Sequence, residues 1–104
     1  MITASFHREA EQLIGISVSG HAGYAKAGRD IVCAAVSACL EMCANGITEI
    51  AGEQADIQTE ANRITVRSTQ KTAALFMQAF ELEMQRIAEQ YPTHIRLVYS
   101  NGKL

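Results

Sequence analysis

The chain has 104 residues, a length that predicts one compact domain over residues 1–104, because a two-layer core fits this size and a second domain does not. A hydrophobic fraction of 48% is sufficient for such a core. The net charge of −2, without a block of basic residues, argues against direct nucleic-acid binding and makes a basic protein or peptide the more suitable partner.

The first residues predict two strands. Apolar and polar side chains alternate over residues 2–7 and again over 14–19, which is the period-two pattern of half-buried strands. A short polar segment, 9–12, separates the two runs, so together they predict an antiparallel hairpin.

A loop is expected after this hairpin, over residues 22–29, because the segment shows no apolar periodicity. The glycines that border or interrupt it are Gly20, Gly23 and Gly28. They increase the range of backbone conformations, and Tyr24 is the only large side chain present. We therefore expect this loop to be mobile.

A helix is predicted from about residue 31 to 49 or 50, with Asp30 as its N-cap and Gly52 beyond its end. Gly46 costs such a helix about 1 kcal/mol relative to alanine, so it is the competing boundary. The apolar stripe of the helical wheel contains Val32, Val36, Cys39, Leu40, Cys43, Ile47 and Ile50. Cys33 lies at the edge of this stripe, whereas the other two cysteines lie near its middle.

The remaining sequence predicts two strands, a helix and a last strand. Residues 56–59 and 63–67 have the pattern of a second hairpin. Ser68 or Thr69 is expected to cap a helix that ends before Pro92. The apolar stripe of this helix contains Ala73, Phe76, Met77, Phe80, Met84, Ile87 and Tyr91. Residues 94–99 form another strand and 101–103 a polar tail.

The predicted order is therefore β-β-α-β-β-α-β. Pairs of strands separated by helices with one apolar stripe each predict an α+β domain, in which a mostly antiparallel sheet of about five strands packs against two helices.

A possible reactive centre lies where the loop enters the first helix. The first turn of a helix favours negative charge, so it favours the thiolate of Cys33, and His21 lies twelve positions upstream as a possible base. Amides of this turn are expected to bind an oxyanion. We expect Asp30 to cap the helix, although it could instead orient His21. Ser37, one turn beyond Cys33, could support the site by a hydrogen bond.

The cysteines favour a reducing compartment and no metal. Three is an odd number, so a disulfide framework is improbable. Cys39 and Cys43 have a helical i, i+4 spacing that suits zinc, but their apolar neighbours favour core packing.

The segment 31–36, the longest apolar run near the start of the helix, is too short for a bilayer, and the N-terminus has no secretory signal. We therefore expect a soluble, cytoplasmic protein without cofactor or metal, in which His7 and His94 have no catalytic role.

The residues Gly20-His21-Ala22, Gly28 and Asp30-Ile31-Val32-Cys33-Ala34-Ala35-Val36-Ser37 resemble the motif of the ribosomal-processing cysteine protease family, Prp. The likeness extends over the whole chain, including the closing run 94–99. The resemblance implies a bacterial cytoplasmic endopeptidase, usually homodimeric, that removes a short N-terminal extension from a protein of the large ribosomal subunit. It also implies that His21 is the base and Cys33 the nucleophile. We expect Asp30, Ser37, Gly20 and Gly28 to support this site.

Two other classes of function are compatible with the sequence. A thiol-based redox sensor would use Cys33 without His21, and a non-enzymatic ribosome-associated module would bind through a sheet edge or an apolar patch. That patch consists of Leu75, Ala79 and Leu82, which are also candidates for a dimer contact. For a protease, we expect the loop residues Ala22, Gly23 and Tyr24 to close over the substrate peptide.

Overall fold

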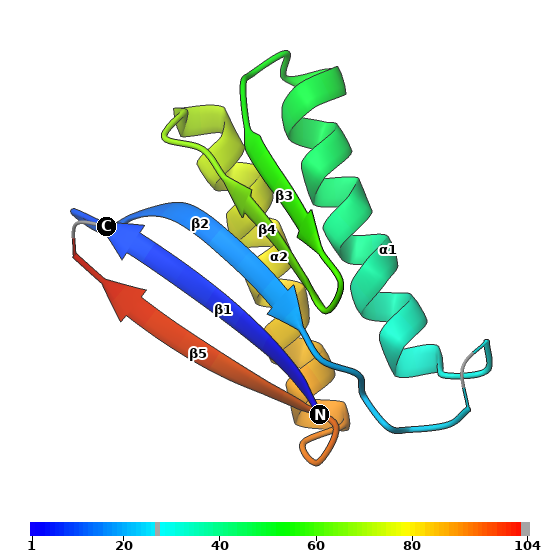
Figure 1. The fold of residues 1–104 in the computed structure, drawn as a ribbon. Helices are drawn as coiled ribbons and strands as arrows, with labels where there is room; N and C mark the ends of the chain where they lie inside the picture. Colours follow the sequence, from blue (N-terminus) through cyan, green and yellow to red (C-terminus); the bar gives the residue numbers. More distant parts are fainter. Residues whose placement is uncertain (27, 103–104) are drawn as a thin grey trace.

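The computed structural model describes residues 1–26 and 28–102, and its elements follow the predicted order (Figure 1). A π-helical segment, η1, directly follows the first α-helix. In chain order the elements are β1 (Ile2–Glu9), β2 (Gln12–Ser19), α1 (Ile31–Asn45), η1 (Gly46–Ile50), β3 (Asp56–Glu60), β4 (Arg63–Arg67), α2 (Lys71–Gln90) and β5 (Ile95–Asn101). The predicted α+β class with two α-helices is confirmed.

The five strands form one sheet in the order β3-β4-β2-β1-β5, in which only β1 and β5 are parallel. The prediction of a mostly antiparallel sheet is therefore confirmed. The parallel pair places the start of β5 beside the start of the chain, where Ile2 N–H donates to the His94 carbonyl (2.9 Å). β5 extends through Asn101, which was predicted to begin a polar tail; residue 103 of that tail lies outside the described residues.

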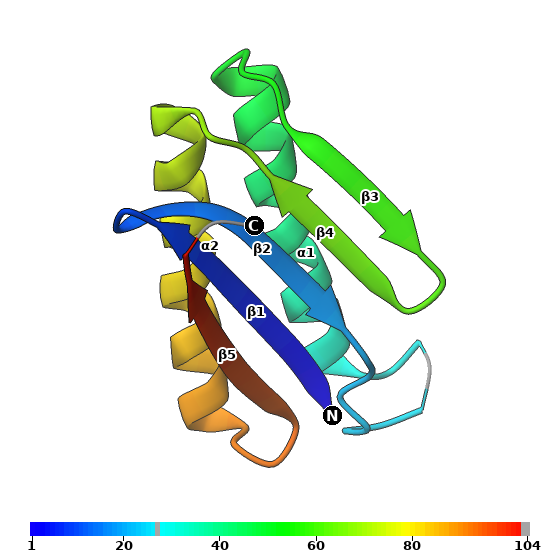
Figure 2. The ribbon, with the colours of Figure 1, turned by 60° about the vertical axis from the view of Figure 1, so that its left-hand side comes forward.

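Both α-helices lie against the same face of the sheet, so the molecule has two layers (Figure 2). The side chains between them form the core, and its largest fully buried members are Phe6, Leu13, Ile16, Ile47, Met77, Met84, Ile95, Val32, Val36 and Val66. By length and composition alone, the 20 residues of α1 and η1 could also cross a membrane. In this fold their buried side chains belong to the core, as is usual for a core helix.

The transition from α1 to η1 occurs at Gly46, the competing boundary in the sequence. A Cβ atom at this position would lie 2.5 Å from the Phe76 ring of α2, so only glycine allows the two helices to approach this closely. The N–H of Ala51 bonds to the carbonyl of Gly46 in the i to i+5 pattern. Because this wider turn changes the helical period, the predicted placement of Ile50 on the apolar stripe is wrong, and its side chain is 81% exposed.

The N-terminus of α2 is capped by a residue from outside the helix. The prediction that Ser68 or Thr69 caps this helix is wrong. The N-cap is Gln70, and its side chain makes no capping hydrogen bond. Instead, the carboxylate of Glu53 accepts a hydrogen bond from Ala73 N–H (2.6 Å). A distant acidic group therefore satisfies a free amide of the first turn and places negative charge at the positive end of the helix.

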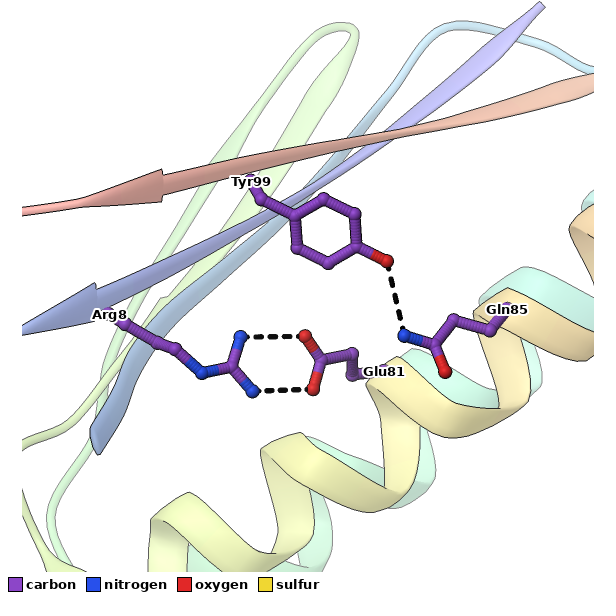
Figure 3. A network of polar contacts seen from close by, with 4 residues as sticks. All are labelled: Arg8, Glu81, Gln85 and Tyr99. Atoms are coloured by element: carbon purple, nitrogen blue, oxygen red, sulfur yellow. Dashed lines mark hydrogen bonds and ion pairs between the residues drawn. The ribbon is translucent and has the colours of Figure 1, made fainter. Parts of the chain in front are cut away.

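An ion pair joins the C-terminal end of β1 to α2 (Figure 3). Two nitrogens of Arg8 donate to the two carboxylate oxygens of Glu81, both at 2.7 Å. Glu81 is buried, and its hydrogen bonds raise the pKa of Arg8. Beside the pair, Gln85 donates to the hydroxyl of Tyr99 (3.2 Å). These polar contacts attach α2 to β1 and β5, because a bidentate pair requires one relative orientation of its two partners.

Candidate active site

Asp30 connects the loop to the start of α1. One carboxylate oxygen accepts hydrogen bonds from the N–H groups of Val32 and Cys33, both at 3.0 Å, which confirms the predicted N-cap. The other accepts from Tyr24 N–H (3.1 Å) and Ala25 N–H (3.4 Å). The amide of Cys33, followed by those of Ala25 and Tyr24, lowers the pKa of Asp30. The ionised carboxylate thus holds the loop against the first turn of the helix.

The cap occupies two of the amides that were expected to bind an oxyanion. The first-turn amides of Val32 and Cys33 already donate to Asp30, so in this structure they do not point to a vacant anion site. The amide that contacts the thiol belongs to the loop instead: Ala22 N–H donates to Cys33 Sγ over 3.3 Å. The sequence alone did not indicate this contact.

The beginning of the loop is more firmly packed than its composition predicts. Ala22 is 3% exposed and belongs to the core, and its carbonyl is 2.9 Å from Nδ1 of His94. The Tyr24 ring makes edge contacts with the rings of Tyr91 and His94, at centroid distances of 5.5 and 5.4 Å. Thus Tyr24 packs against the end of α2 and the start of β5. His94, for which no catalytic role was expected, contacts Ala22, the residue that follows His21.

The residue before His21, Gly20, has a backbone conformation and surroundings that strongly favour glycine. Gly20 has a φ of +83°, and a Cβ atom there would collide with the carbonyl oxygen of Met1. Its N–H donates to the carbonyl of Asn62 in the β3–β4 turn (3.3 Å). Gly28 also has a positive φ, +84°, although open space surrounds it. Both conformations favour glycine, and the exposed His21 side chain directly follows the constrained Gly20.

Two cavities meet at the candidate residues. His21, Cys33 and Ser37 line both of them. One cavity, of about 570 Å³, lies on the side of the loop, where its other lining residues are Gly23, Ala25, Gly28, Asp30 and Ala34. The second, of about 220 Å³, extends toward the β3–β4 turn at residues 59–64. A half-buried thiol between two cavities is suited to react with an extended chain that occupies both.

The other two cysteines have environments that oppose reactivity. Burial raises the pKa of Cys39, and the nearby charge of Glu83 contributes in the same direction. Burial raises the pKa of Cys43 to about 11. A thiolate is the nucleophilic form, so both groups are poor nucleophiles near neutral pH. Among residues 1–26 and 28–102, no group of three or more His, Cys, Asp or Glu side chains could hold a metal ion.

Known proteins resemble this chain along nearly all of its length. The family model described as cysteine protease Prp matches residues 1–96. A ribosomal processing cysteine protease Prp from Staphylococcus aureus is 35% identical over 89 residues, which cover 81% of this chain and 84% of the relative.

Solved structures show the same similarity. The S. aureus protease Prp with a covalently linked product peptide superposes with a TM-score of 0.89 at 32% identity, covering 95% of this chain and 99% of that one. The protein SMU.848 from Streptococcus mutans gives a TM-score of 0.84 at 26% identity, covering 98% and 96% of the two chains.

Proposed function

Because the chain belongs to the Prp family of cysteine proteases, we propose that it is a cytoplasmic endopeptidase that removes a short N-terminal extension from a protein of the large ribosomal subunit. The S. aureus relative is described as a ribosomal processing protease, and its structures contain a substrate peptide or a covalently linked product peptide. The observation that carries the proposal here is the position of His21 and Cys33, which line both cavities. Membership in a protease family favours this activity over a redox sensor or a non-enzymatic binding module.

In this mechanism, the Cys33 thiolate is the nucleophile and His21 transfers the protons. Sγ attacks the scissile carbonyl carbon, the C–N bond breaks, and protonated His21 gives its proton to the leaving amine. Water then adds to the thioester carbonyl carbon while His21 accepts its proton. The C–S bond breaks, which releases the carboxylic acid and restores the thiolate.

We also propose that the protein is a homodimer. Leu75 and Leu82 of α2 are 62% and 51% exposed, and Ala79 between them is also exposed. The buried stripe of the same helix already packs in the core, so this patch is available to a second copy. An isologous contact between two such patches would remove their apolar surface from water.

The cleavage proposal is tested with a synthetic peptide that contains the encoded N-terminus of the large-subunit protein, with its products identified by mass spectrometry. We expect Cys33→Ala and His21→Ala each to abolish cleavage while the melting temperature stays near that of the parent. Cys39→Ala is the matched control, because it removes a thiol from the same helix but lines neither of the two cavities. Retained cleavage in the Cys33 or His21 variant would refute the assigned roles.

A further inference from the structure

We infer that His94 is a positioning residue for the cysteine chemistry: through the Ala22 carbonyl, it holds the Ala22 amide on the Sγ atom of Cys33. This inference rests on the proposed function, because it assigns a partner to the same nucleophile. The two contacts that carry it are His94 Nδ1 to the Ala22 carbonyl oxygen (2.9 Å) and Ala22 N–H to Cys33 Sγ (3.3 Å).

The direction of the first hydrogen bond follows from its acceptor. A carbonyl oxygen has no proton to give, so Nδ1 of His94 must be the protonated nitrogen that donates. His94 therefore binds the loop whether its ring is neutral with the proton on Nδ1 or positively charged. A side chain without a donor at this place could not make the contact.

The His94 ring has a well-defined position because the His94 backbone is hydrogen-bonded and the ring packs against Tyr24. The N–H of His94 donates to the Tyr91 carbonyl, and its carbonyl accepts from Ile2 N–H, both at 2.9 Å. The ring also makes an edge contact with the Tyr24 ring, at a centroid distance of 5.4 Å. The end of α2 and the first strand thus fix the donor that reaches the loop.

Ala22 transmits this constraint to the reactive atoms. Its side chain is buried, and the peptide bond on its N-terminal side joins it directly to His21. With the carbonyl bound by His94, the backbone around Ala22 has little freedom to rotate, so the amide stays directed at Sγ. A hydrogen bond to the charged thiolate is stronger than one to the neutral thiol, and the contact therefore favours the nucleophilic form.

The test compares substitutions that keep or remove the donor at the position of Nδ1. In His94→Asn the amide nitrogen can occupy that position, whereas His94→Gln carries its amide nitrogen one bond farther out and His94→Leu has no donor. His7→Leu is the matched control, because His7 also bonds a backbone carbonyl, that of Gly102 (2.8 Å), at a distance from the site. All variants are compared with the parent by thermal melting.

The first readout is the rate at which iodoacetamide alkylates Cys33 at pH 7, which requires no substrate. The second is the separation of kcat from KM for cleavage of the ribosomal-protein peptide. We expect His94→Leu and His94→Gln to lower both the alkylation rate and kcat by about tenfold, with little change in KM. We expect His94→Asn and His7→Leu to retain rates near those of the parent.

Unchanged alkylation and kcat in His94→Gln would overturn the inference, and so would equal losses in His94→Asn and His94→Gln. The glutamine variant keeps the test decisive if His94→Leu does not fold. Cleavage that survives Cys33→Ala would instead refute the proposed function, while the alkylation rates would still report on the His94 contact. The two failures are therefore distinguishable.

Discussion

The carboxylate of Asp30 accepts a hydrogen bond from the backbone N–H of Cys33 at 3.0 Å, so the residue that caps α1 also binds the candidate nucleophile's own amide. The same carboxylate binds two amides of the loop that leads from His21. One ionised group therefore holds together the segments that carry His21 and Cys33. We therefore expect its charge to stabilise this arrangement.

This relationship predicts an acid-dependent loss of stability. The pKa of Asp30 in the folded protein lies below its ordinary value of 3.8, so the ionised form favours the folded state above that pH. The contribution is lost as the pH falls through the lowered pKa. Asp30→Asn keeps a good N-cap without the charge, so its melting temperature should fall less than that of the parent between pH 6 and pH 3.

Asp56→Asn is the matched control, because Asp56 lies on the exposed strand β3 and caps no helix. Its pH dependence should match that of the parent. An identical acid response in Asp30→Asn and the parent would show that the Asp30 charge does not stabilise the loop.

The three thiols should differ in reactivity. We expect iodoacetamide to label Cys33 first and Cys43 last, because burial and a pKa of about 11 keep Cys43 neutral at pH 8. Peptide mapping of the alkylated protein measures the order. Cys43→Ala should keep peptide cleavage but lose about 1 kcal/mol or more of unfolding free energy, since it removes a buried side chain. Labelling of Cys43 as fast as Cys33 would contradict this assignment.

Gly46→Ala should destabilise the protein, although alanine is the better helix former by about 1 kcal/mol. The added methyl group would lie 2.5 Å from the Phe76 ring, so α1 and α2 would have to move apart. We expect a net loss of about 1–3 kcal/mol in denaturant unfolding. Phe76→Ala in the same chain should make the Gly46 substitution less costly, and additive effects would exclude this contact as the cause.

Glu81→Gln should destabilise the contact between β1 and α2. The substitution leaves the Arg8 guanidinium without its bidentate charged partner, which we expect to cost about 1–3 kcal/mol of unfolding free energy. Urea denaturation measures the loss. Glu83→Gln removes the same charge from an exposed position of α2 and should change stability little. Equal effects of the two substitutions would mean that the pair contributes no more than surface charge does.

Leu82→Glu should shift the protein toward monomer in sedimentation velocity, because it places a charge in the exposed patch of Leu75, Ala79 and Leu82. Gln90→Glu introduces the same charge near the end of α2, away from the patch, and should leave the association unchanged. A Leu82→Glu variant that remains dimeric would place the interface on another surface, such as a sheet edge.

The sequence by itself determined the features that depend on neighbouring residues. The period-two and 3.6-residue patterns predicted the strands and helices, because the spacing of apolar residues along a segment differs between a half-buried strand and an amphipathic helix. Asp30 was recognisable as a cap because it directly precedes an apolar helical pattern. The motif around His21 and Cys33 indicated the family for the same reason, since its residues lie close together in the chain.

Only the tertiary structure decided the contacts between distant segments. Phe76 makes Gly46 necessary, and Glu53 caps α2, but neither relationship is visible in a local pattern. The parallel register of β1 and β5 brings His94 to Ala22 across 72 positions. Such pairs depend on strand order and on the packing of side chains between layers. Sequence periodicity specifies which face of an element is buried, but not which residue it meets there.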